Sequence, residues 1–331
     1  MTFDTALTRR FGLRLPVVAG GLMWLGDADY AAAAARSGIL GFITAASFPD
    51  PADLKAEIAK ARRLCGQAPF GVNVSMLPKL VPGEKTEEVF RIIAGEGVEV
   101  IETSGRNPEA YMPLLRDLGL TVIHKVPSVR FAVTAERIGV DMVAIVGAEC
   151  GGHPGMDMVG SLVNGALAET RLTIPYLIGG GVGHGAQLVA ALAMGAAGVV
   201  MGTRLLVAEE LNAHRGYKDA LVAATERDTT LSMQSVRNTI RTLANETTRV
   251  VQQMEAEDPN IGIEALMPHV SGKIGRQAYR TGDVSKGLLS AGQSLGLTDR
   301  VQPMVEIIAR IEAEAMTARD RIAAVMPLEE V

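Results

Sequence analysis

Short apolar runs alternate with longer amphipathic stretches over the first two-thirds of the chain. Eight runs are apolar on both faces, which is typical of strands in a parallel sheet covered by helices. They span residues 15–19, 39–45, 70–74, 98–103, 121–125, 141–146, 174–178 and 198–201. Helical patterns lie between them, and some carry start signals such as Asp50-Pro51. Eight strand–helix units predict a (β/α)8 TIM barrel; a doubly wound sheet, with roughly five or six strands, fits less well.

The pattern changes after residue 204. Residues 208–282 are richer in charge, threonine, methionine and glutamine, and they show helical patterns at 231–249 and 263–267 but no strand-like run. A final stretch, residues 301–325, places apolar side chains at helical spacing. We therefore expect residues 1–210 and 286–331 to form an α/β barrel with a returning helix. Residues 211–285 are expected to form a small helical substrate or lid domain.

Composition narrows the classes of function. Of 331 residues, 4% are aromatic and the net charge is -5, which disfavours a nucleic-acid partner. The two cysteines, Cys65 and Cys150, do not make a disulfide framework, so a reducing compartment is expected. No apolar run resembles a signal peptide or reaches the ~18 residues of a membrane span. These features predict a cytoplasmic protein without a membrane span.

The most informative loop follows the sixth predicted strand. It reads Glu149-Cys150-Gly151-Gly152-His153-Pro154-Gly155 and presents a histidine beside glycines at a strand's carboxyl end. Barrel enzymes place their chemistry at this edge, and histidine suits proton transfer near neutral pH. His153 is therefore the candidate catalytic base. Cys150 is expected to be a small buried residue, since an activated thiolate needs a nearby positive group.

The ends of the last two predicted strands indicate an anion site. Gly180 and Gly181 follow the seventh strand, and Gly202 and Thr203 follow the eighth. Backbone N–H groups converging there are the usual phosphate site of such barrels. An FMN-sized ligand held by its phosphate would lay its ring across the barrel mouth. Lys125, at the end of the fifth strand, could then face the ring as a fixed positive charge. Taken alone, it is equally well explained as a solvated or ion-paired lysine.

Other candidates are weaker. His124 is expected to be structural, and His184 is expected to cap a helix more than to bind phosphate. No cluster of His, Cys and carboxylates has metal-ligand spacing, so no metal site is predicted. Met23, Met76 and Met156 follow strand ends and can line an apolar pocket.

Taken in order, these motifs resemble the nitronate monooxygenase family, also called the 2-nitropropane dioxygenase family, of FMN-dependent TIM barrels. Among its branches the bacterial NADH:quinone reductases are the most similar. The matching segments are Pro16-Val17-Val18-Ala19-Gly20-Gly21 with Trp24 and Gly26; Gly71-Val72-Asn73 with Leu77-Pro78; Glu102-Thr103-Ser104-Gly105; Ile123-His124-Lys125; Ala135-Glu136-Arg137; residues 149–155; Met201-Gly202-Thr203-Arg204; Ser235-Val236-Arg237-Asn238-Thr239; Gly275-Arg276-Gln277; and Ser290-Ala291-Gly292-Gln293.

The resemblance implies a non-covalent FMN and a base at His153 that takes a proton from a substrate carbon. The expected cofactor contacts are Gly20, Gly21, Leu22, Asn73, Lys125, Gly151, Gly152, Gly180, Gly181, Met201, Gly202 and Thr203. The expected substrate pocket is Met23, Trp24, Met76, Met156, Ser290 and Gln293. The partner would be a small apolar, nitro or quinone compound. A homodimer is one expected assembly, and the sequence does not determine the oligomeric state.

Several activities stay open at this point. The resemblance favours oxidation of an alkyl nitronate or similar carbon acid with O2. The quinone-reductase branch instead implies NADH or NADPH as donor and a quinone as acceptor. Reduction of an enoyl thioester and a non-catalytic flavin-binding barrel are further alternatives. Four residues depart from the family pattern and bear on the choice of substrate: Ala19, Val146, Gly179 and Ala197. The first three replace polar residues and would make the site more apolar.

Overall fold

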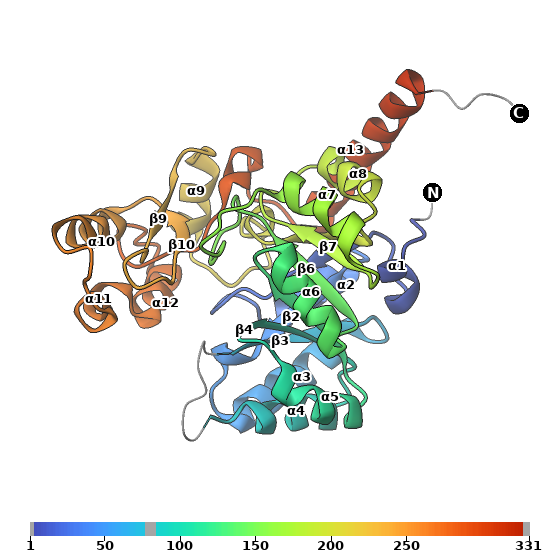
Figure 1. Cartoon of the computed structure of the whole chain (residues 1–331), viewed down its shortest axis with the longest axis horizontal. Helices are drawn as coiled ribbons and strands as arrows, with labels where there is room; N and C mark the ends of the chain where they lie inside the picture. The colour runs from blue at the N-terminus through green and yellow to red at the C-terminus, as the bar shows by residue number, and fades with distance from the viewer. Residues whose placement is uncertain (1–2, 77–83, 327–331) are drawn as a thin grey trace, which may run out of the picture.

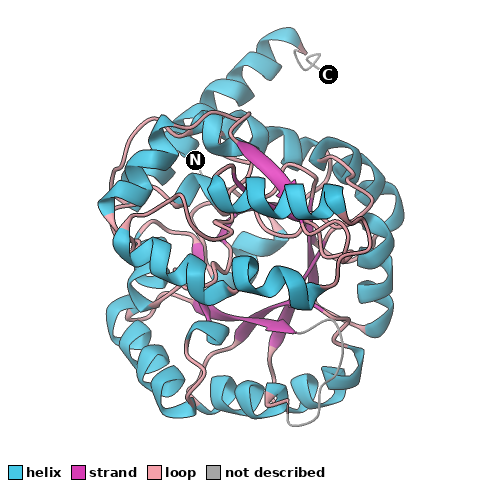
Figure 2. Ribbon diagram, turned by 90° about the vertical axis from the view of Figure 1, so that its left-hand side faces the viewer, coloured by secondary structure: helices cyan, strands magenta, loops and turns pink. Residues whose placement is uncertain are grey.

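The computed structural model describes residues 3–76 and 84–326. Within this part, eight parallel strands close into a barrel in the order β1 to β8, with β1 paired to β8 (Figures 1 and 2). The strands are β1 (Val17–Ala19), β2 (Leu40–Thr44), β3 (Phe70–Met76), β4 (Val100–Gly105), β5 (Thr121–Val126), β6 (Met142–Val146), β7 (Tyr176–Gly179) and β8 (Gly198–Met201). The predicted TIM barrel is thus confirmed. Leu77-Pro78 of the family motif lies outside the described residues.

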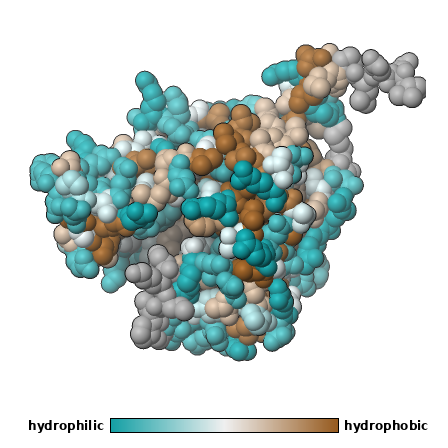
Figure 3. Space-filling model, viewed as in Figure 1, coloured by the Kyte–Doolittle hydropathy of each residue, from teal (hydrophilic) through white to brown (hydrophobic). Residues whose placement is uncertain are grey.

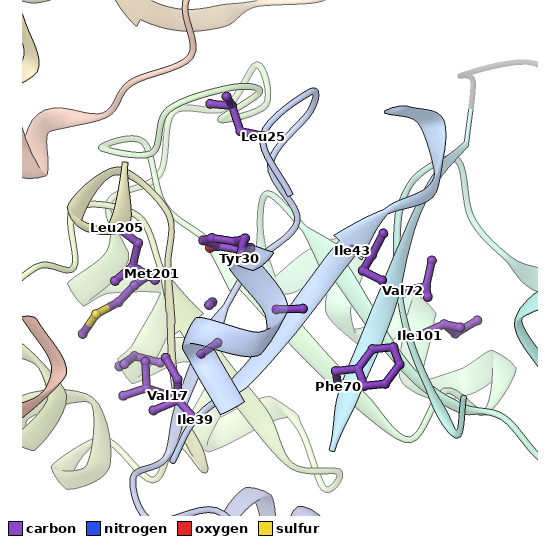
Figure 4. Close-up of a cluster of buried hydrophobic side chains, with 14 of the residues drawn as sticks. Val17, Leu25, Tyr30, Ile39, Ile43, Phe70, Val72, Ile101, Met201 and Leu205 are labelled. Carbon is purple, nitrogen blue, oxygen red and sulfur yellow. The ribbon is translucent and has the colours of Figure 1, made fainter. Parts of the chain in front are cut away.

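Each strand has two buried faces, as the apolar runs predicted. One face points into the barrel, where Val18, Phe42, Val100 and other side chains form an interior cluster. Helix α1 (Ala6–Phe11) contributes Leu7 to this cluster and packs against the barrel interior. The opposite face packs under the helices in a larger cluster, part of which is drawn in Figure 4.

The helices follow the strands around the barrel (Figure 2). They are α2 (Ala28–Arg36), α3 (Pro51–Cys65), α4 (Thr86–Gly95), α5 (Met112–Asp117), α6 (Val129–Ile138), α7 (Ser161–Arg171) and α8 (Gly185–Ala193). The Asp50-Pro51 start signal works as expected, since the Asp50 carboxylate accepts a 2.8 Å hydrogen bond from the Ala52 amide. The returning helix α13 (Met304–Val325) packs against α8 and α2. None of the described helices is long and apolar enough to cross a membrane.

Residues 215–281, called the lobe below, project from one side of the barrel (Figure 1). The lobe contains α9 (Arg215–Ala223), β9 (Thr229–Ser232), β10 (Ile240–Leu243), α10 (Glu246–Glu257), α11 (Ile263–Val270) and α12 (Gly272–Thr281). The predicted helix at 231–249 is wrong. Its first half is an antiparallel pair of strands, β9 and β10. Met233 and Arg237 adopt left-handed backbone angles between them, which would interrupt a helix.

Candidate active site

Three polar side chains meet inside the barrel at the carboxyl ends of β3, β4 and β5. Side chains alternate along a strand, so Glu102 shares the inward face with Val100, and Lys125 shares it with Ile123. The Glu102 carboxylate Oε2 accepts hydrogen bonds from Lys125 Nζ at 3.0 Å and Asn73 Nδ2 at 2.6 Å. The backbone amide of Gly21 donates to the same oxygen at 3.1 Å. Lys125 is therefore ion-paired with Glu102 and is not a solvated lysine.

The ends of β7 and β8 expose backbone donors. Gly180 and Gly181 have φ values of 92° and 70°, a left-handed conformation that favours glycine. Among the described residues, none accepts a hydrogen bond from the amides of Gly180, Gly181 or Gly202. A Cβ at Gly202 would meet only Leu22 Cδ2, at 3.7 Å. Unpaired amides beside open space suit a phosphate group.

The loop that carries His153 is tied to the lobe. Gly152 and Arg241 of β10 form an isolated antiparallel bridge, in which each amide donates to the other carbonyl oxygen. The Arg241 guanidinium also donates from Nε to the Ala148 carbonyl at 3.1 Å and from Nη1 to Thr229 Oγ1 at 3.1 Å. A later residue of the loop, Met156, accepts a 3.1 Å hydrogen bond at its sulfur from Thr239. The lobe therefore determines the path of this loop.

The beginning of the same loop is held from the barrel side. Both carboxylate oxygens of Glu149 lie 3.1 Å from the Ser161 amide at the start of α7, where the helix dipole favours negative charge. Gly151 packs against Ala291 so tightly that a Cβ would lie 2.7 Å from that backbone. The Gln293 amide donates to the Glu149 carbonyl at 2.9 Å.

His153 stands between these attachments. Its side chain is exposed, and none of the described residues hydrogen-bonds to the imidazole. Surrounding protein nevertheless desolvates the ring and lowers the imidazole pKa below its usual value of 6.5. The ring is therefore mainly neutral at pH 7 and has a nitrogen free to accept a proton. A hollow lies between the lobe and the barrel on the face shown in Figure 3.

The predicted cofactor residues fall into two groups. Asn73, Lys125, Gly180, Gly181 and Gly202 lie at strand ends beside the barrel mouth. The Gly152 amide and carbonyl are instead paired with Arg241 of the lobe. Gly21 and Gly151 have no room for a side chain, because other parts of the chain lie against them. A Cβ at Gly21 would lie 2.4 Å from Asn73 Cβ. The Met201 side chain packs in the outer cluster and therefore points away from the barrel interior (Figure 4).

Three further predicted cofactor residues, Gly20, Leu22 and Thr203, make hydrogen bonds within the protein. Gly20 donates from its amide to the Met201 carbonyl at 3.2 Å. The Leu22 carbonyl accepts a 3.1 Å hydrogen bond from Thr44. The Thr203 hydroxyl accepts from the Gly292 amide at 2.8 Å, which leaves the Thr203 backbone as its contribution to an anion site.

The predicted pocket residues are spread over several elements. Trp24 has a left-handed φ of 67°, and the Arg276 guanidinium of α12 lies 4.9 Å from its ring, so the first loop touches the lobe. Met23 and Met156 are exposed, whereas Met76 is buried. Ser290 is bridged to Thr242 of β10, and the Gln293 side chain is exposed.

The four departures from the family pattern do not all face the site. Ala19 belongs to the outer cluster, so the expectation that it removes a polar group from the site is wrong. Ala197 lies in the interior cluster. Gly179 and Val146 face each other inside the barrel, where a Cβ on Gly179 would lie 3.0 Å from Val146 Cγ1. Of the four positions, Gly179 and Val146 are therefore the two that face the barrel interior at the carboxyl ends of their strands.

The remaining candidates have structural positions. His124 is buried, lies 2.9 Å from Thr103 Oγ1 through Nδ1, and has its pKa lowered to about 4 by burial. His184 caps α8, as expected, by accepting from the Ala186 amide. Burial raises the pKa of the Cys150 thiol to about 12, which disfavours a thiolate nucleophile. In the described part of the chain, no group of three or more His, Cys, Asp and Glu side chains is placed to hold a metal ion.

Two positions of interest were missed by sequence reasoning. Arg241 belongs to the region predicted as helix, and no local pattern indicates its pairing with Gly152 across the chain. Glu102 was noticed at a strand end but given no role. An acidic residue inside an otherwise apolar run was the available signal for it.

The model of the nitronate monooxygenase family matches residues 4–314. In Rhodococcus jostii, (3aS,4S,5R,7aS)-5-hydroxy-7a-methyl-1-oxo-octahydro-1H-indene-4-carboxyl-CoA dehydrogenase is 32% identical over 231 residues, which cover 70% of this chain and 63% of that protein. A probable nitronate monooxygenase of Staphylococcus aureus strain N315 is 26% identical over 87% of this chain and 91% of its own. The solved structure of FabK from Thermotoga maritima has a TM-score of 0.89 and 31% identity, covering 98% of this chain and all of that one.

Proposed function

Because the chain belongs to the nitronate monooxygenase family, we propose that it is an FMN-dependent oxidoreductase that oxidises a carbon acid, such as a nitroalkane, or the alkyl nitronate that is its conjugate base, with O2. The observation that carries this proposal is the position of His153. Its imidazole is neutral at pH 7, free of hydrogen bonds to the described residues, and held between the barrel and the lobe. A neutral, unengaged imidazole is what a general base requires.

The residues at the strand ends fit FMN. The unpaired amides of Gly180, Gly181 and Gly202 suit its phosphate. Asn73 and the Lys125–Glu102 pair supply polar contacts at the mouth for the rest of the molecule. When bound, FMN supplies an electron-accepting ring, which none of the protein's own side chains provides.

The remaining steps belong to the chain's own residues. His153 would take the proton as the substrate C–H bond breaks, which leaves the electron pair of that bond on the substrate carbon. Lys125 contributes a fixed positive charge that is partly balanced by Glu102. The lobe would keep His153 oriented, because Arg241 holds the loop through the Ala148 carbonyl.

A second candidate is an oxidoreductase that acts on an acyl-CoA thioester. The Rhodococcus relative is named for such a substrate and is 32% identical to this chain. The α-carbon of a thioester is also a carbon acid, so the same base would serve both reactions. The two candidates differ in the size of the substrate and in the electron acceptor.

Anaerobic mixing separates the candidates. The purified protein is loaded with FMN and mixed with propyl nitronate, NADH, NADPH or a short acyl-CoA, and loss of flavin absorbance is followed. Rapid bleaching by nitronate supports the first proposal, bleaching by a thioester supports the second, and bleaching by NADH or NADPH alone supports a reductase. His153→Asn should slow turnover of a carbon acid roughly 10²- to 10⁴-fold. His269→Asn on α11 is the matched control, and equal rates for the two variants would refute His153 as base.

A further inference from the structure

Helix α12 carries three cations on its outward side. Lys273, Arg276 and Arg280 follow one another at three- and four-residue spacing, so they share one side of the helix. All three are exposed, and they span about 10 Å along the helix axis. The opposite side of the helix is buried through Ala278 and Tyr279. Packing of α12 against the lobe therefore fixes the direction in which the cations point.

The three cations are not neutralised by the protein. None of the described residues forms an ion pair or a hydrogen bond with any of the three charged groups. Helix α12 itself contains no acidic residue. Helix α10 of the same lobe differs, because three glutamates outnumber its single basic residue, Arg249. The outward side of α12 is thus a positive surface that attracts anions.

This surface begins beside the barrel mouth. The Arg276 guanidinium lies 4.9 Å from the centre of the Trp24 ring, and a Cβ on Gly272 would lie 3.5 Å from the indole nitrogen. Trp24 belongs to the loop after β1, in which Leu22 lies next to Gly202 of the proposed anion site. The loop therefore connects the edge of the mouth to the first turns of α12, where the lobe meets the barrel (Figure 1).

We infer that the outward side of α12 binds the phosphates of the CoA portion of an acyl-CoA substrate. CoA carries a diphosphate and a ribose 3′-phosphate, and arginine and lysine are the side chains that bind such groups. The pantetheine arm separates these phosphates from the thioester, so they can stay outside the mouth while the thioester enters toward His153. This inference rests on the second candidate function, oxidoreduction of an acyl-CoA thioester.

The α12 cations are not required for the cofactor. The phosphate of FMN is assigned to the unpaired amides at the ends of β7 and β8. Loss of the α12 cations should therefore leave FMN bound, and a CoA site on α12 can be tested in the FMN-loaded protein.

Calorimetric titration of the FMN-loaded protein with CoA tests the inference. The double variant Lys273→Ala with Arg280→Ala should raise the Kd for CoA roughly fivefold to thirtyfold, the range for the loss of two exposed ion pairs. Arg276 is retained, so its contact with Trp24 is preserved. Higher salt should weaken CoA binding to the wild type more than to the double variant. Far-ultraviolet circular dichroism checks that the variant folds.

Two control variants separate the position of the charges from their number. Lys273→Arg with Arg280→Lys keeps both positive charges and should bind CoA within about threefold of the wild type. Arg249→Ala removes an exposed cation from α10 and should bind CoA as the wild type does. A loss in Arg249→Ala as large as in the double alanine variant would indicate general attraction to the lobe and would overturn the inference.

NADP⁺ carries comparable phosphates and shows whether the surface serves CoA. If the double alanine variant binds NADP⁺ more weakly but CoA as tightly as the wild type, the assignment to CoA is overturned. It is also overturned if the wild type does not bind CoA. CoA binding that depends on the α12 cations, without flavin bleaching by an acyl-CoA, would support the site and refute the second candidate function.

Discussion

Arg241 and Gly152 exchange two backbone hydrogen bonds, in which the Arg241 amide donates at 2.7 Å and the Gly152 amide at 3.0 Å. Gly152 directly precedes the proposed base, so a strand of the lobe fixes the backbone from which His153 projects. The Arg241 side chain reinforces this pairing through the Ala148 carbonyl. Orientation of His153 is therefore shared between the barrel and the lobe.

Removal of the Arg241 side chain should lower activity without abolishing FMN binding. Arg241→Ala loses the bonds to Ala148 and Thr229, so the His153 loop is less constrained. Because small misplacements of a catalytic group are costly, we expect kcat to fall roughly tenfold to a hundredfold. Steady-state kinetics and FMN titration check this, with the exposed Arg249→Ala as control. An unchanged kcat would show that the backbone pairing alone orients the loop.

Activity should depend on pH through His153. Desolvation lowers its pKa below 6.5, so the basic, neutral form persists to lower pH than for a free imidazole. With a carbon-acid substrate, kcat/KM should rise with pH and level off, with a midpoint below 6.5. His153→Asn should remove this rise. A midpoint above 6.5 would mean that another group controls the profile.

Stability should depend on pH through His124. Its pKa is about 4 in the folded protein and about 6.5 in the unfolded chain, so the unfolded chain binds more protons between these values. The part of the unfolding free energy that is linked to His124 is fully present above pH 6.5. It is lost as the pH falls toward 4, by roughly 3 kcal/mol at most. Urea unfolding at a series of pH values measures this loss.

Variants of two histidines show whether His124 causes that loss. His124→Gln should flatten the dependence of the unfolding free energy on pH between 4 and 6.5, because glutamine does not titrate. His269→Gln, a change on α11, should leave the slope as in the wild type. Equal slopes in both variants would assign the acid sensitivity to other groups.

Gly202 offers a test of the anion site. Its φ of -121° lies outside the left-handed region, and a side chain there would project into open space beside the unpaired amides. Gly202→Val should therefore weaken binding of FMN roughly tenfold or more by blocking its phosphate. Binding of riboflavin, which lacks the phosphate, should change much less. Gly95→Ala, also beside open space, is the control, and equal losses for both flavins would argue against a phosphate here.

The barrel was predictable because its signal is local. The barrel strands are mostly apolar on both faces, so runs such as residues 70–74 identify strands without knowledge of their partners. The β9 and β10 strands were missed because they are short, partly polar and separated by residues in left-handed conformations, Met233 and Arg237. Alternating polarity over four residues is too brief to compete with a helical pattern.

Site residues could be predicted only where they lie at or just after the end of a predicted strand. His153, Lys125 and the glycines after β7 and β8 fall at such ends, and their positions follow once the barrel is assumed. The outward direction of Ala19 depends on the phase of side-chain alternation, which a three-residue strand leaves undetermined. The partners of Glu102 and Arg241 come from distant segments, and no single-sequence pattern reports such pairs.

The bond from Arg241 to Ala148 joins residues 93 positions apart. Contacts between residues so far apart in the sequence form late in folding, because the entropy of a long loop must be lost before they form. The β6 and β7 strands can therefore pair before the His153 loop meets β10. During refolding, we expect secondary structure to recover first and enzymatic activity to return in a later kinetic phase.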